Sequence, residues 1–291
     1  MKPKDLNMQD YKTVSDRYLP LTEHFLELSK KLDYVKAFWI HGSRSVGRHI
    51  YKSDIDYLFV LSNNQNKKEF EKELGRFIEW KDTQGFFPEQ TWRGCRWNNN
   101  GALEKIGVHI YTEDEVNEMF SDFFNNEPMD ISGMTWLERW QNTKFLGSQG
   151  AAQFMVCESV PVYDPSSILP KLKSEVAKYP DECSTQIVDL MIGYLETKLR
   201  WFGDPWVPRS KYSFMVDMKE VLYFIAAAHY AKNKAFMQQG LKRYHLDLKT
   251  LKPDIQKDLD KLLAIDDKFE VEDKARYLKN IIGALRESNS K

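Results

Sequence analysis

Apolar positions near the start of the chain first follow the period of a helix and then form short continuous runs. A helix is predicted by four apolar positions at spacings of three and four: Leu21, Phe25, Leu28 and Leu32. The runs 36–43 and 53–62 are short, apolar and rich in aromatic and β-branched residues, which predicts two buried strands. The polar segment between them contains glycine and predicts a tight turn followed by a short helix.

The next part of the chain completes one α+β unit. Residues 67–81 carry Phe70, Leu74 and Ile78 in helical register. Residues 85–112 are typical of a β-hairpin whose turn lies at 98–101. Two more strands are therefore expected after the second helix.

From about Glu113 onward the pattern is helical and strand signals nearly cease. The proline-marked segment 160–167 is interpreted as a loop. The expected helices are 113–126, 134–146, 167–179, 184–203, 213–236, 251–265 and 271–288. We therefore expect an α+β protein in which an N-terminal mixed β-sheet flanked by helices, residues 1–125, precedes an all-helical bundle, residues 126–291.

Composition restricts the possible classes of function. The 291 residues include 42 basic and 43 acidic side chains, and 42% are hydrophobic. A core-forming soluble protein is expected, and the balanced charge disfavours a polynucleotide substrate. The sequence has no apolar run of membrane-spanning length and no signal-peptide pattern, so we expect a cytoplasmic protein without a membrane partner. Three widely separated cysteines, Cys95, Cys157 and Cys183, indicate neither a disulfide framework nor a zinc site.

One short stretch carries a recognisable chemical pattern. Gly42 and Ser43 end the first predicted strand, ten residues follow, and Asp54 and Asp56 begin the next. Residues i and i+2 of a strand point to the same face, so the two carboxylates can converge on divalent cations, for which hard oxygen ligands favour Mg²⁺ or Mn²⁺. Glycine lets the backbone approach a polyphosphate, to which a serine hydroxyl can donate. A surface turn with incidental acids is the alternative.

Residues 41–60, HGSRSVGRHIYKSDIDYLFV, resemble the signature of the DNA polymerase β type nucleotidyltransferase superfamily, and the spacing is similar to that of minimal nucleotidyltransferases. The resemblance implies a nucleoside triphosphate, with ATP expected, bound with two divalent ions. An acceptor hydroxyl would attack its α-phosphate and release pyrophosphate. Asp54 and Asp56 would be metal ligands and Ser43 a phosphate ligand.

The sequence departs from this family in one respect. Members usually carry a third carboxylate on a later strand, whereas residues 105–112 offer His109 and no acid. Glu104 lies five residues before His109, so strict alternation places it on the opposite face. One hypothesis makes His109 the general base or a metal ligand. A half-buried histidine bonded to backbone, or a base supplied by the helical domain, are the alternatives.

Basic and aromatic residues provide further candidates for binding. Arg44, Arg48 and Lys52 follow the glycine turn and could neutralise a triphosphate; solvated surface is the alternative. Trp97 lies beside Trp92, Arg93 and Arg96, where it could bind an acceptor, although packing is the commoner explanation. A second candidate acceptor wall lies between predicted helices and comprises Arg209, Lys211, Tyr212, Asp217 and Glu220.

The two-domain layout is similar to that of aminoglycoside and lincosamide nucleotidyltransferases, which implies a small-molecule acceptor bound against the helical domain. A protein hydroxyl on a partner toxin, modified with AMP, is the second hypothesis. A catalytically degenerate nucleotide-binding protein is the third, because the third acid is missing. A dimer is expected by analogy alone.

Overall fold

The computed structural model describes residues 10–45, 53–80, 92–124, 156–177, 179, 181–202, 211–235, 251, 253–264 and 271–287. These residues divide into two compact units. The first contains residues 10–124 and 156–177 and holds the β-sheet, and the second begins at Tyr179 and is helical. The α+β class is therefore confirmed. The sheet unit takes in residues 156–177, which lie beyond the predicted boundary at 125.

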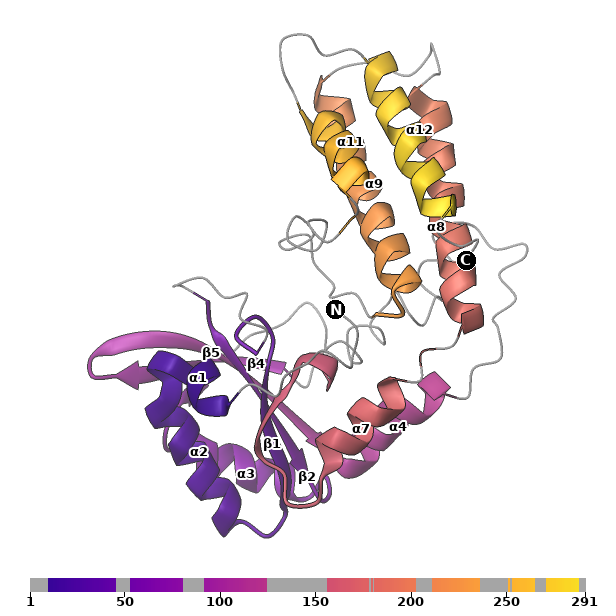
Figure 1. The fold of residues 1–291 in the computed structure, drawn as a ribbon. Helices are drawn as coiled ribbons and strands as arrows, with labels where there is room; N and C mark the ends of the chain where they lie inside the picture. Colours follow the sequence, from indigo (N-terminus) through magenta and orange to yellow (C-terminus); the bar gives the residue numbers. More distant parts are fainter. Residues whose placement is uncertain are drawn as a thin grey trace. The chain divides into compact units, whose positions relative to one another are not determined.

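A mixed sheet forms the centre of the first unit (Figure 1). Among the described residues it has six strands in the order β3-β4-β5-β2-β1-β6. The bounds are β1 Val35–His41, β2 Ile55–Leu61, β3 Glu79–Trp80, β4 Trp92–Asn99, β5 Ala102–Thr112 and β6 Val160–Tyr163. Strand β2 pairs antiparallel with β1 and parallel with β5. The two predicted strands and the predicted hairpin are thus confirmed.

Helices lie on both sides of this sheet. Their bounds are α1 Tyr11–Ser15, the 3₁₀ helix η2 Asp16–Tyr18, α2 Leu19–Lys31, α3 Asn66–Leu74, α4 Glu113–Phe124 and α7 Ile168–Val176. Figure 1 places α2 and α3 on one side of the sheet and α4 and α7 on the other. Helix α3 ends at Leu74, before the predicted end at residue 81, and Glu79–Trp80 form the edge strand β3 instead.

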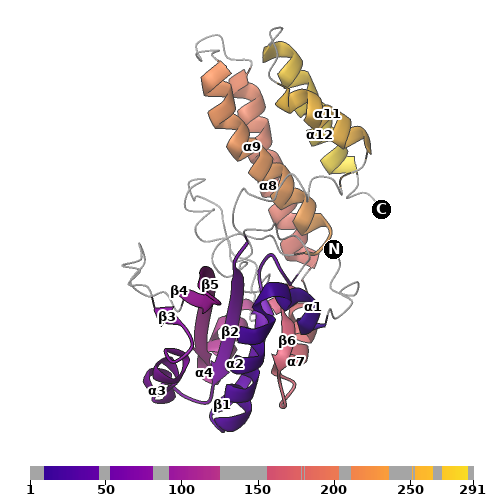
Figure 2. The ribbon, with the colours of Figure 1, turned by 90° about the vertical axis from the view of Figure 1, so that its left-hand side faces the viewer.

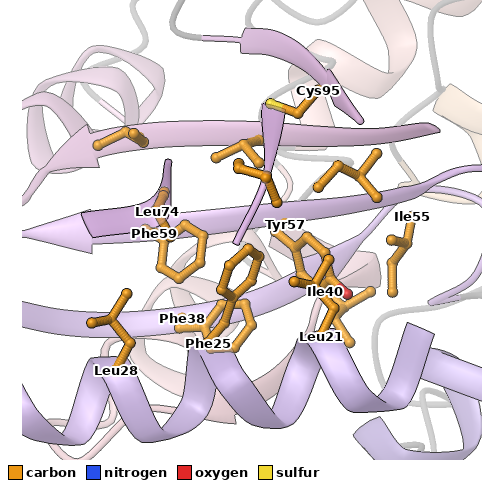
Figure 3. Close-up of a cluster of buried hydrophobic side chains, with 14 of the residues drawn as sticks. Leu21, Phe25, Leu28, Phe38, Ile40, Ile55, Tyr57, Phe59, Leu74 and Cys95 are labelled. Atoms are coloured by element: carbon orange, nitrogen blue, oxygen red, sulfur yellow. The ribbon is translucent and has the colours of Figure 1, made fainter. Parts of the chain in front are cut away.

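Aromatic packing fills the space between α2 and the sheet (Figure 3). The rings of Phe38 and Phe59 are stacked with centroids 4.5 Å apart, and Phe25 of α2 meets both rings edge-on. Burying a phenylalanine side chain contributes about 1.5–3 kcal/mol, so this cluster fixes which face of β2 is covered. Ile55, Tyr57, Phe59 and Leu61 belong to this core. The alternate positions of β2, beginning with Asp56, therefore point to the other face, and Asp54 immediately precedes the strand.

The β4–β5 turn is specified by two residues. Asn100 and Gly101 have φ angles of 51° and 92°, the left-handed pair that a two-residue hairpin of type I′ requires. The Asn98 side chain also accepts a 2.7 Å hydrogen bond from the backbone N–H of Gly101. The turn predicted at 98–101 is confirmed.

The segment predicted as a loop at 160–167 contains a strand instead. Val160–Tyr163 pair antiparallel with β1 at the edge of the sheet. Proline is tolerated at an edge, where its missing N–H need not join the ladder, and Pro161 pairs with Trp39 there. The loop prediction was wrong because four residues carry almost no periodic signal.

The second unit consists of long helices, as predicted. They are α8 Asp181–Phe202, α9 Lys211–Lys232, α11 Pro253–Leu263 and α12 Val271–Glu287. Figure 2 shows α8 and α9 side by side, and α12 packs on both α8 and α11. Within the described part of the chain, no helix combines the length and apolar character needed to cross a membrane. The helix predicted at 134–146 lies outside the described residues.

Candidate active site

The predicted site lies at the edge of the sheet where β1 ends and β2 begins. Because the two strands are antiparallel, His41 at the end of β1 pairs with Asp56 at the start of β2. On its other side Asp56 pairs with Gly107 of β5. Directly paired residues share a face of a sheet. His41, Asp56 and Gly107 therefore form a row on the face opposite the aromatic core.

Gly42 lies directly against the carboxylate of Asp56. Its φ angle is +80°, and a Cβ added to it would lie 2.6 Å from Asp56 Oδ2. Real Cβ atoms do not approach an oxygen that closely, and residues other than glycine rarely adopt this φ. Both the backbone conformation and the space beside Asp56 thus require glycine at position 42. The predicted grouping of the glycine turn with the second aspartate is present in the fold.

Asp54, the other predicted metal ligand, is paired with a lysine that the sequence did not single out. The Nζ atom of Lys105 lies 2.9 Å from Asp54 Oδ2. The hydrogen bond to Asp54, together with the charges of Asp54 and Asp56, raises the pKa of Lys105 above its usual value. The lysine side chain is 62% exposed and that of Asp54 is 28% exposed. An exposed pair of this kind contributes little to the stability of the fold.

Lys105 could have been placed on the site's face from sequence, but not beside Asp54. It lies four residues before His109 on the same strand, so alternation puts both side chains on one face. Its neighbour across the sheet depends on the parallel pairing of β5 with β2, in which Ile55 is opposite Ile106. That register joins segments some fifty residues apart and leaves no local pattern in the sequence.

Two buried histidines adjoin the aspartates. The rings of His41 and His109 have centroids 4.7 Å apart at an interplanar angle of 67°. Burial lowers the pKa of His41 to about 4, and burial followed by the proximity of His41 lowers the pKa of His109 well below its usual value. Both imidazoles are therefore neutral at neutral pH. Within the described part of the chain, the buried atoms His41 Nε2 and His109 Nδ1 have no hydrogen-bond partner.

Glu104 lies on the far face, as the alternation argument predicts. It forms a 3.1 Å ion pair with Arg17, and its carboxylate also accepts a 3.5 Å hydrogen bond from the Tyr18 hydroxyl. Its partner across the hairpin is Trp97, a member of the aromatic core. Glu104 therefore cannot serve as the third carboxylate, and on the site's face of β5 the residues are Lys105, Gly107, His109 and Tyr111.

Arg44, a candidate phosphate contact, has backbone and aromatic partners in the structure. Its side chain is only 1% exposed. The guanidinium donates hydrogen bonds to two backbone carbonyls, from Nη2 to Ser53 at 3.1 Å and from Nε to Asp54 at 3.2 Å. It also lies over the Tyr18 ring, 4.8 Å from the centroid. Arg44 thus fixes the backbone that leads into Asp54 and Asp56.

The other residues of the predicted phosphate site are only partly described. Ser43 is buried at the turn, and the following Ser45 donates a 2.7 Å hydrogen bond to the Gly42 carbonyl. This bond holds the turn that carries Gly42. Arg48 and Lys52, and the short helix predicted around them, lie outside the described residues.

Trp97 has the packing role that the sequence left as the alternative. It is 8% exposed, belongs to the aromatic core and lies 6.0 Å from the Tyr18 ring. That position is on the opposite face from Asp56, so its predicted role in acceptor binding is not supported. Arg96, one position earlier, shares the face of Lys105, with which it pairs.

The acceptor-side candidates of the helical unit are also paired. Lys198 of α8 lies 2.8 Å from Asp217 and 2.6 Å from Glu220, both on α9. The three charges link α8 to α9, which gives the two acids a structural role. Lys211 and Tyr212 begin α9, and Arg209 lies outside the described residues.

The donors at the sheet edge fit a divalent cation of the magnesium type. Asp54 and Asp56 are hard oxygen donors, and the backbone of Gly42 lies against the Asp56 carboxylate. The described residues contain no group of three or more histidine, cysteine or acidic residues arranged to hold a metal ion. Among the described residues, the carboxylate donors in this region are the two aspartates, and water or phosphate oxygens would complete the coordination.

Comparisons with known proteins found similarity only at the level of structure. No protein-family model and no curated protein match the chain. Among solved structures, a nucleotidyltransferase-like protein from Exiguobacterium sibiricum is 13% identical, with a TM-score of 0.38, over 92% of this chain and 74% of its own. An aminoglycoside 6-adenyltransferase from Bacillus subtilis is 13% identical, with a TM-score of 0.30, over 91% of this chain and 87% of its own.

A third solved structure, the conserved protein GrpB from Enterococcus faecalis, is 18% identical, with a TM-score of 0.27, over 55% of this chain and 92% of its own. The structure neighbours thus include nucleotidyltransferase-like proteins. At these identities and TM-scores they say nothing of the substrate or activity of this chain, which has to be inferred from its own residues.

Proposed function

We propose that this protein is a metal-dependent nucleotidyltransferase that moves a nucleoside monophosphate from a nucleoside triphosphate, expected to be ATP, to a hydroxyl group of a small molecule. One observation carries the proposal. Gly42, at φ +80°, lies against Asp56 Oδ2 with no room for a Cβ, and Asp54 lies two residues before Asp56, immediately before strand β2. Two aspartates supply hard oxygen donors for a divalent cation, and a glycine beside them lets a polyphosphate approach the backbone.

In the reaction, one bond to the α-phosphorus forms and one bond to it breaks. The acceptor oxygen forms a bond to the α-phosphorus while the bond from that phosphorus to the bridging oxygen breaks, and pyrophosphate leaves. The hydroxyl proton passes to a base. A bound divalent cation would supply charge neutralisation and polarisation of the phosphate oxygens, with Asp54 and Asp56 holding it.

The roles of this chain's own residues follow from their positions. Arg44 holds the carbonyls of Ser53 and Asp54, so the aspartates are oriented before substrate binds. We propose His109 as the base because it lies on the site's face of β5 and its imidazole is neutral at neutral pH. Its lowered pKa makes it a weak base unless the charge of bound substrate raises that pKa. Ser43, Arg48 and Lys52 remain the proposed phosphate contacts.

The acceptor is proposed from the resemblance of the motif and the two-unit layout. The helical unit that begins at Tyr179 would bind it, and an aminoglycoside- or lincosamide-like antibiotic is the favoured class. A hydroxyl on a partner protein is the alternative acceptor for the same chemistry. Both use the site at Asp54 and Asp56, so one assay with two acceptor panels separates them.

A catalytically degenerate nucleotide-binding protein is the second candidate function, and a specific observation favours it. Lys105 lies on Asp54, and the site's face of β5 carries no acid. Such a protein would bind nucleotide without turnover. Pyrophosphate release distinguishes the two candidates, because the enzyme would release pyrophosphate and the degenerate protein would not.

The test is a pyrophosphate-release assay with Mg²⁺, each of the four common nucleoside triphosphates, and panels of small-molecule and protein acceptors. We expect release that requires both Mg²⁺ and an acceptor, and that falls at least 100-fold in Asp56→Asn. Asp33→Asn is the matched control, because Asp33 is an exposed aspartate just before β1, at the opposite end of that strand from Gly42. Absence of release with every acceptor would contradict the transferase proposal.

A further inference from the structure

We propose that Lys105 takes the place of a second divalent cation, so that the site binds one metal ion and uses the lysine ammonium as its other positive charge. The inference rests on the proposed function and specifies which groups supply the positive charge in its site. It concerns a residue that neither the motif nor the expected phosphate contacts include.

The first argument is the position of the ammonium group. Its nitrogen lies 2.9 Å from Asp54 Oδ2, which is the distance of a charge-assisted hydrogen bond. It therefore occupies an oxygen that a second metal ion would need. Asp56 follows two residues later on the same face, so the ammonium belongs to the aspartate pair.

The second argument is the number of donors. Two divalent ions held about 3.5–4 Å apart need several shared oxygen ligands. In the described part of the chain no group of three candidate ligand side chains occurs. The residue opposite Asp56 on β5 is Gly107, which has no side chain to coordinate a metal. Two carboxylates are a sufficient set for one ion that keeps several water ligands, as Mg²⁺ does. A second ion would have to draw its ligands from bound phosphate oxygens and from the Asp54 oxygen that Lys105 occupies.

The third argument is the charge balance of the site. The ammonium of Lys105 already neutralises one of the two carboxylates, so a second divalent ion bound at Asp54 would meet a positive charge at short range. Like charges at such short range repel strongly in a partly buried site. Lys105 is bound directly to Asp54. Its positive charge therefore repels a divalent ion at Asp54 more strongly than one held at Asp56.

With a lysine in place of a second metal ion, neutralisation of the phosphate charge and deprotonation of the acceptor are carried out by different groups. A lysine ammonium can neutralise phosphate oxygens as a point charge, but it cannot activate a bound hydroxyl as a metal ion does. Deprotonation of the acceptor then falls to a side chain, consistent with the role proposed for His109. The lysine is long and 62% exposed, so it can reach from Asp54 toward a bound triphosphate.

The experiment counts bound Mn²⁺ by electron paramagnetic resonance, with and without a nonhydrolysable ATP analogue. Wild type is compared with Lys105→Met, which keeps most of the side-chain length and removes the charge, and with Lys105→Gln as a second neutral variant. Lys30→Met is the matched control, because Lys30 forms a similar 2.8 Å ion pair with Glu27 on the surface of α2. Circular dichroism confirms that each variant is folded.

We expect about one Mn²⁺ per chain in wild type and in Lys30→Met, and about two in both Lys105 variants when the analogue is bound. Two ions in wild type, or the same number in wild type and both Lys105 variants, would overturn the inference and leave the proposed function standing. No bound Mn²⁺ in any of the four proteins would instead contradict the proposed function itself.

Discussion

Gly42 and Asp56 are in direct contact across the β1–β2 pair, since a Cβ at position 42 would lie 2.6 Å from Asp56 Oδ2. The contact joins the two halves of the sequence motif, which are separated by thirteen residues along the chain. It explains why the turn must be glycine, because any larger residue would displace the carboxylate.

The first prediction is that Gly42→Ala disables the site. The methyl group would push the Asp56 carboxylate aside, and the left-handed backbone would cost about 1–2 kcal/mol in addition. We expect Mn²⁺ affinity to fall at least 10-fold and the free energy of unfolding to fall by about 1–3 kcal/mol. Metal titration and urea unfolding measure the two effects.

Gly101→Ala is the control for this prediction. Gly101 has a φ of +92° but has nothing within 4 Å of the position of a Cβ. It therefore imposes the backbone strain without touching Asp56. Equal loss of Mn²⁺ binding in the two variants would show that the contact with Asp56 is not what matters.

The second prediction concerns Arg44, which we interpret as a positioning residue. Arg44→Met should lower the free energy of unfolding by about 2–4 kcal/mol, because two partly buried carbonyls lose a charged donor. Arg44→Lys should recover only part of the lost free energy of unfolding, since an ammonium cannot reproduce the paired hydrogen bonds of the planar guanidinium. Urea unfolding is the measurement, and Arg76→Met, at an arginine whose side chain is 63% exposed, should change stability by less than about 0.5 kcal/mol.

A KM and kcat measurement separates positioning from phosphate contact at Arg44. Positioning predicts that Arg44→Lys lowers kcat and leaves the KM for the nucleotide nearly unchanged. A rise in that KM with kcat unchanged would instead restore the phosphate-binding role that the sequence suggested.

The third prediction is a loss of stability in mild acid that depends on His41. The folded-state pKa of His41 is about 4, below the usual 6.5 of an unfolded chain. Between these values the unfolded state binds more protons, so the free energy of unfolding decreases as the pH falls. The contribution of His41 to the free energy of unfolding is fully present above pH 6.5. It is lost progressively as the pH falls to about 4, and the total loss is on the order of 3 kcal/mol.

His41→Phe isolates this contribution, because phenylalanine keeps a ring in the buried site and cannot be protonated. Urea unfolding of the metal-free protein at pH 7 and at pH 4.5 should show a smaller difference in the variant than in wild type. Identical differences would mean that the His41 imidazole is not the group protonated on unfolding.

The fourth prediction tests the helical unit by itself. Lys274 of α12 is 6% exposed, and its ammonium donates to the carbonyls of Lys261 and Ala264 at the end of α11. Lysine at a helix C-terminus satisfies carbonyls that have no partner within the helix. Lys274→Met should therefore destabilise this unit by about 2 kcal/mol.

Lys279→Met provides the matched comparison for Lys274, because it removes an exposed lysine from the same helix. Thermal unfolding followed by circular dichroism should distinguish the two variants. Equal unfolding temperatures would show that the contact between Lys274 and α11 contributes nothing to stability.

The parts of the fold that local sequence determines were predictable. The strands β1 and β2, the glycine turn and the Asn100-Gly101 hairpin each depend on residues within a few positions of one another. The face occupied by Glu104 also followed from alternation alone. The glycine, the two aspartates and His109 could therefore be selected as candidates from sequence.

The remaining features depend on contacts between distant segments. Strand β6 joins β1 across more than one hundred residues, and Lys105 meets Asp54 only through the parallel pairing of β5 with β2. Arg44 was considered a phosphate contact because the sequence gives the charge of a residue but does not give its burial in the fold. A charged residue beside a motif is as able to bind backbone carbonyls as to bind a ligand, and only its position in the fold decides between them.

The most direct test of the central claim measures Mg²⁺-dependent binding of a nonhydrolysable ATP analogue by isothermal titration calorimetry, which requires no knowledge of the acceptor. Wild type and Asp33→Asn should bind the analogue at least 10-fold more tightly in Mg²⁺ than in EDTA, and Asp56→Asn should lose that difference. Equal affinity in Mg²⁺ and EDTA for wild type, or an undiminished Mg²⁺ effect in Asp56→Asn, would contradict the assignment of the aspartate pair as a metal-nucleotide site.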